Sequence, residues 1–61
     1  MLDFAEKVLY AIRSRKKQAE DIITGGGVKD MEHYKFLMGR IEGCKFVEDD
    51  VLALLKKNPD L

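Results

Sequence analysis

The chain has 61 residues, 46% of them hydrophobic, and a formal net charge of zero, which limits it to one small domain. The balance of 11 basic and 11 acidic residues argues against a strongly electrostatic nucleic-acid binder. No apolar run approaches the ~20 residues of a membrane span. One cysteine and one histidine supply neither an internal disulfide nor a structural zinc site. We therefore expect no cofactor, no metal and no membrane association, and a cytoplasmic location.

The N-terminal part of the chain predicts one long helix. "MLDFAEKVLYAIRSRKKQAEDIIT" has no proline or glycine, and its apolar residues recur at helical spacing. We predict a helix over about 3–24, with Asp3 as the N-cap and Glu6 completing a capping box. Its predicted inward seam consists of Ala5, Val8, Ile12, Arg15, Ala19 and Ile22.

A second helix is predicted over about 30–57. Asp30 is a suitable N-cap, and Asn58-Pro59 ends the helix because proline disfavours helical geometry in the residue before it. Its predicted inward seam consists of Tyr34, Leu37, Ile41, Cys44, Glu48, Val51 and Leu55.

Gly25, Gly26 and Gly27 separate the two helices, in a predicted turn over 25–29. We place a left-handed C-cap at Gly25, directly after Thr24, and expect the other two glycines to let the chain reverse. A phosphate-binding loop is the alternative, but it requires a strand before its glycines and a Gly-Lys-Ser/Thr ending. The sequence therefore predicts an all-α fold, a single two-helix antiparallel hairpin domain over 1–61.

The second helix carries more apolar surface than one neighbour can cover. At 100° per residue, a second face lies about 110° from the inward seam. It contains Phe36, Gly43, Val47 and Leu54, with Gly39 and Phe46 along its edge. Exposed apolar patches mark interaction sites. We predict that these six residues form a protein interface, and that oligomerisation, as in a coiled coil, or docking on a larger partner completes the fold.

The segment "RSRKK" gives an alternative reading. Arg13, Lys16 and Lys17 would carry nucleic-acid binding in a small dimer, architecturally like plasmid-encoded RNA-binding four-helix bundles of the Rop type. Against this, acidic residues one turn later pair with these lysines. Arg15, at a seam position, needs a partner if it is buried. We assign it Glu48 of another chain, since we expect the hairpin register to place Glu48 near Lys7.

No set of residues predicts catalysis. His33 is expected to be a surface or capping residue, and Cys44 a small buried hydrophobe of the seam. No nucleophile, base and orienting group come together, and two helices enclose no useful pocket. We predict that the protein is not an enzyme and has no small-molecule substrate.

The line "GGGVKDMEHYKFLMGRIEG" resembles small proteins encoded among the structural and packaging genes of tailed bacteriophages. The matching residues are Gly26, Gly27, Val28, Lys29, Tyr34, Lys35, Leu37, Met38 and Gly39. The resemblance implies a virion or morphogenesis component, located in the host cytoplasm or the virion, that binds itself or a capsid or connector subunit. A small inhibitor of a host protein is a further alternative.

Overall fold

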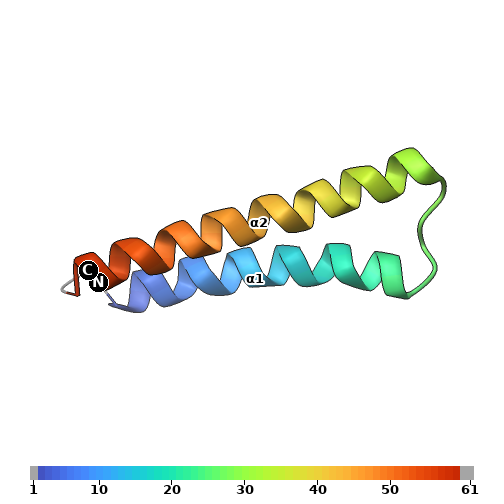
Figure 1. The fold of residues 1–61 in the computed structure, drawn as a ribbon. Coiled ribbons are helices and arrows are strands. Elements are labelled where there is room, and N and C mark those ends of the chain that lie inside the picture. Colours follow the sequence, from blue (N-terminus) through green and yellow to red (C-terminus); the bar gives the residue numbers. More distant parts are fainter. Residues whose placement is uncertain (1, 60–61) are drawn as a thin grey trace.

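Two antiparallel helices and the turn between them make up the whole described chain, residues 2–59 of a computed structural model (Figure 1). α1 spans Leu2–Thr24 and α2 spans Met31–Lys57. The helices lie side by side in a rod of 44 × 16 × 11 Å, so the start of α1 and the end of α2 share one end. The predicted all-α hairpin is confirmed, with each helix boundary within one residue of its predicted place.

Side-chain caps fix both ends of α2. The Asp30 carboxylate accepts a hydrogen bond of 2.7 Å from the His33 backbone N–H, so Asp30 is the N-cap as predicted. At the other end, the backbone N–H and side-chain amide of Asn58 both donate to the Leu54 carbonyl, and Pro59 follows. The prediction for α1 was wrong, because Asp3 lies inside its first turn rather than before it.

The three glycines close α1 with a Schellman motif. The Gly27 N–H donates to the Ile22 carbonyl at 2.9 Å, and the Gly26 N–H lies 3.5 Å from the Ile23 carbonyl. The left-handed residue is Gly26, with φ of 79°, and not Gly25 as predicted. Gly25 has a steric role instead, because a Cβ there would come within 2.8 Å of the Asp21 carbonyl oxygen. The prediction that this segment is a turn is thus confirmed, with the left-handed residue one position later than predicted.

The core is small and is densest near the turn. In residues 3–59, five hydrophobic side chains are buried: Ala5, Leu9, Ala19, Leu37 and Ile41. Ala19 and Leu37 are each only 1% exposed, and with Ile41 they form a cluster against which Ile23 and Val28 pack. A short side chain at Ala19 lets α2 approach α1 closely enough to enclose Leu37.

The predicted seam of α2 faces α1, but the predicted seam of α1 is rotated. On α2, Leu37 and Ile41 are buried, and Cys44, Glu48, Val51 and Leu55 are partly buried, whereas Tyr34 at the turn end is 39% exposed. On α1, Arg15 is exposed and Ile22 is 38% exposed. The predicted seam residues Ala5, Val8, Ile12 and Ala19 are buried or partly buried, and Leu9, Lys16 and Ile23 join them in place of Arg15 and Ile22.

The left-handed backbone at Gly26 generates a first prediction. Gly26→Ala should destabilise the hairpin by about 1 kcal/mol, because an L-residue with a Cβ is disfavoured in this region. Gly26→Asn is the matched control and should retain more of the stability, since asparagine tolerates this conformation better. Urea unfolding followed by circular dichroism measures both. An alanine variant as stable as the wild type would contradict the assignment.

Candidate functional site

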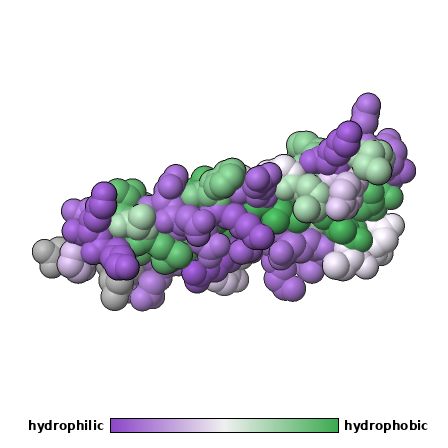
Figure 2. Space-filling model, viewed as in Figure 1, coloured by the Kyte–Doolittle hydropathy of each residue, from purple (hydrophilic) through white to green (hydrophobic). Residues whose placement is uncertain are grey.

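The second face of α2 is the largest group of predicted site residues, and α1 does not cover it. The exposed fractions of its large side chains are 61% for Phe36, 61% for Phe46, 49% for Val47 and 56% for Leu54. Gly39 and Gly43 are exposed as well. Figure 2 shows hydrophobic patches on the surface, interrupted by hydrophilic side chains. All six predicted interface residues therefore lie outside the contact between the helices, and their role in binding stays a prediction.

Within residues 2–59, no steric contact requires glycine at positions 39 and 43. A Cβ added to either residue would have open space around it, with no contact within 4 Å beyond the local helix backbone. Each glycine inside a helix lowers its stability by about 1 kcal/mol relative to alanine. Close packing within the hairpin does not explain this loss, in contrast to Gly25 and Gly27 of the turn, whose added Cβ atoms would meet Asp21 and Ile22.

Two charged residues accompany the second face. The Arg40 guanidinium lies over the Phe36 ring, 5.7 Å from its centroid, one turn along the helix. Asp50 follows Val47 by three residues and is exposed. Within residues 2–59, neither Arg40 nor Asp50 has an ion-pair partner. Sequence reasoning missed both residues because it followed hydrophobic side chains only, although the helical spacing places them beside Gly43 and Val47.

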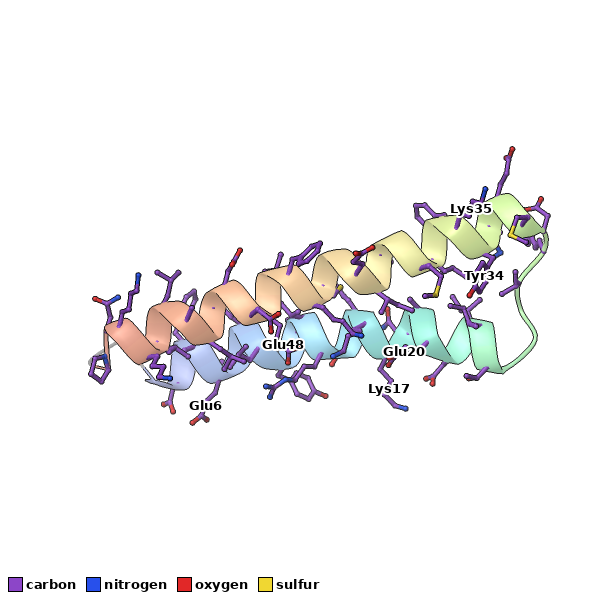
Figure 3. All side chains as sticks on the ribbon, viewed as in Figure 1. Glu6, Lys17, Glu20, Tyr34, Lys35 and Glu48 are labelled. Carbon is purple, nitrogen blue, oxygen red and sulfur yellow. The ribbon has the colours of Figure 1, made fainter. Side chains whose placement is uncertain are left out.

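A compact ionic group crosses the middle of the hairpin. The Glu48 carboxylate binds the Arg13 guanidinium and, at 3.2 Å, the Lys16 ammonium. Figure 3 shows Glu48 directed from α2 toward α1, whereas Lys17 extends from the outer side of α1. The expected pairing of Arg15 with Glu48 of another chain is wrong, as is the expected proximity of Glu48 to Lys7. The register places Glu48 level with Arg13 and Lys16 of its own chain.

This ionic group is partly shielded from solvent. The Glu48 side chain is 13% exposed and that of Lys16 22%, while that of Arg13 is 54% exposed. Hydrogen bonds from Arg13 and then from Lys16 hold the pKa of the Glu48 carboxyl below its usual 4.5. Glu48 is therefore ionised in the folded hairpin and fixes the level of α2 against α1.

The residues predicted for nucleic-acid binding are all in contact with carboxylates. Arg13 and Lys16 bind Glu48, and Lys17 lies 3.5 Å from Asp21, one turn along α1. They do not form a single cationic surface with free charges. A phosphate backbone would have to compete with these carboxylates for the same three side chains.

His33 and Cys44 have structural surroundings. The Nδ1 atom of His33 accepts a hydrogen bond of 3.1 Å from the Lys29 backbone N–H, which ties the turn to the first turn of α2. This confirms the capping reading of His33. Cys44 is partly buried at the contact with α1. Among the described residues, no cluster of three or more His, Cys, Asp or Glu side chains could bind a metal ion.

The hollows in the surface are shallow and open. One is lined by Met38, Ile41 and Lys45, by Phe46 at the edge of the second face, and by the carboxylates of Glu42 and Asp49. Another lies at the turn, between Ile23, Val28 and Tyr34. Neither helix, over the described residues, is long and apolar enough to cross a lipid bilayer.

Comparison with known proteins gives no relative for this chain: no family model, no curated protein and no solved structure matches it. The function is therefore inferred from the geometry of the second face and of the ionic group.

The ionic group generates a second prediction. Glu48→Gln should lower the melting temperature at neutral pH, because an amide cannot replace the carboxylate between two cations. Since the folded state lowers the pKa of Glu48, its stabilising contribution is present above the unfolded carboxyl's pKa. That contribution is lost as pH falls from 4.5 through the lower folded pKa, so the difference between variant and wild type should narrow there.

Thermal melts across this pH range, followed by circular dichroism, measure the difference. Asp49→Asn is the matched control, since Asp49 is exposed and has no ion-pair partner among residues 2–59. It should change the melting temperature little at any pH. A Glu48→Gln variant that differs from the wild type equally at neutral and acid pH would contradict the ionic assignment.

Proposed function

We propose that the chain is a non-enzymatic interaction protein that works by association through the second face of α2, with copies of itself or with a larger protein. The observation that carries the proposal is the exposure of Phe36, Val47 and Leu54 on one side of a helix whose opposite flank faces α1 or solvent. Burying each of these side chains contributes about 1.5–3 kcal/mol. A hairpin with so few buried residues gains substantially from such a contact.

The two glycines support the same proposal. Gly43 lies within the second face and Gly39 at its edge, and neither is required by packing inside the hairpin. Glycine on an exposed helix face lowers the surface locally and allows another backbone to approach. A contact made outside the hairpin accounts for residues that weaken the helix inside it.

A finer proposal, assembly of a phage particle, rests on the resemblance of the segment from Gly26 to Gly39 to small phage proteins. A capsid or connector subunit would then be the larger partner. The nucleic-acid alternative predicts salt-dependent binding through Arg13, Lys16 and Lys17, and the carboxylate contacts of these residues do not favour it.

The proposal predicts the effect of filling the glycine site. Gly43→Leu should abolish or strongly weaken association while the hairpin stays helical, because the added side chain stands where the partner must approach. Lys45→Leu is the matched control: it adds the same side chain two residues from Gly43, about 160° away around α2, and should leave association unchanged. Analytical ultracentrifugation gives the solution mass, and circular dichroism gives the helicity.

The wild-type chain is expected to form a helical dimer or larger assembly under the same conditions. A wild-type protein that stays monomeric at high concentration, melts cooperatively and remains soluble would count against the proposal. So would a Gly43→Leu variant that associates as the wild type does.

A further inference from the structure

α2 carries a second line of residues with the spacing of a coiled-coil seam. Its members, separated by four and three residues in turn, are Phe36, Arg40, Gly43, Val47, Asp50 and Leu54. All six are exposed on the described hairpin. The line covers about 27 Å of helix, at a rise of 1.5 Å per residue. It includes the four central residues of the second face, together with Arg40 and Asp50, which have no ion-pair partner within residues 2–59.

This line is complementary to itself when two copies run antiparallel. In the register that places Gly43 opposite Val47 of a second copy, Phe36 falls opposite Leu54 and Arg40 falls opposite Asp50. Each couple occurs twice, once on either side of a two-fold axis. The Phe36–Leu54 pair is apolar, and the Arg40–Asp50 pair joins opposite charges. In the third pair, the Val47 side chain lies opposite Gly43, which has no side chain.

The other simple arrangements lose this match. A parallel pair in register would set Arg40 against Arg40 and Asp50 against Asp50, with like charges opposed at both places. Sliding the antiparallel copy by seven residues in one direction sets Arg40 against Lys57. Sliding it in the other direction leaves Leu54 opposite position 29, before α2 begins at Met31. One register thus satisfies charge, size and length together.

The steric environment of the line agrees with this register. The site of a Cβ on Gly43 is open, so the Val47 side chain of a second copy has room to enter there. Arg40 already lies over the Phe36 ring, which holds the guanidinium on this side of α2. Asp50 has no competing cation within residues 2–59.

We propose that the occupant of the second face is a second copy of this chain, docked antiparallel on α2 with Gly43 facing Val47 of the other copy. The inference rests on the proposed function and deepens it by naming the partner. Self-complementarity favours a second copy over an unrelated protein, which would not require matching charges at symmetric positions on one helix. The resulting assembly is a two-fold symmetric dimer of hairpins, with four helices.

Charge reversal tests the register. In a homodimer of the Arg40→Glu variant, the new carboxylate faces Asp50 at two places. In a homodimer of the Asp50→Arg variant, the new guanidinium faces Arg40 at two places. Each variant alone should dimerise about tenfold or more weakly than the wild type at low salt. An equimolar mixture of the two variants restores both opposite-charge couples. The mixture should form a heterodimer with an affinity within about threefold of the wild type.

Sedimentation equilibrium measures the affinities, and native mass spectrometry distinguishes the heterodimer from either homodimer by mass. Lys45→Glu and Asp49→Arg are the matched controls, because they reverse charges of the same sign at exposed positions that the helical repeat places away from Gly43 and Val47. Both should associate as the wild type does, and mixing them should bring no gain. Circular dichroism verifies that every variant remains helical.

The outcomes separate this inference from the proposal on which it rests. A monomeric wild type overturns self-association altogether. A dimeric wild type whose single variants dimerise normally, or whose mixture fails to restore affinity, overturns the antiparallel register and leaves association through the second face in place. Weakening by each variant and rescue by their mixture support the inference.

Discussion

The shape of the molecule depends on one constraint: a helix in a two-helix hairpin has a single neighbour. Contact with α1 covers only the inward seam of α2, so the hairpin buries five hydrophobic side chains within residues 3–59 and leaves the second face in solvent. Two of the five are alanines, which bury little apolar area. Because a short chain encloses only a fraction of its surface, stability gained from further burial must come from outside the hairpin. The apolar residues of α2 accordingly form two faces, one against α1 and one exposed to solvent.

Along the inward contact, apolar packing and ionic contacts have separate tasks. Near the turn, Leu37 is enclosed against Ala19 and Ile41, and Ile23 and Val28 pack against this cluster. Halfway along, Glu48 meets Arg13 and Lys16 across the helices. Partly exposed ion pairs contribute little free energy, but an ionised carboxylate between two cations disfavours sliding of one helix past the other. Packing thus sets the distance between the helices, while the ionic group sets their relative level.

The helices, the turn and the seam of α2 were predictable, whereas the rotation of α1 was not. Glycine, proline and Asp30 have strong local effects on the backbone, and their positions fixed the element boundaries to within one residue. On α1, three positions of the seam have a neighbour of the same kind: Leu9 follows Val8, Ile23 follows Ile22, and Lys16 follows Arg15. A pattern of hydrophobic and charged residues cannot choose between two such seams. Packing against α2 determines which face of α1 is buried. That rotation of α1 brings Arg13 and Lys16 to Glu48.

The proposed association would couple folding to assembly through α2. Its interior glycines weaken the helix in the isolated hairpin, yet Gly43 occupies the place where the proposed contact demands closeness. Any partner that binds only the helical form stabilises it by mass action, so the order of α2 should rise with the occupancy of its second face. Gly43 lowers the stability of the isolated hairpin. In the proposed dimer, the stability of the helix would therefore depend on association. The glycines of the turn act differently, because their conformation and packing are satisfied within the chain, and their effect on folding is the same whether or not a partner is present.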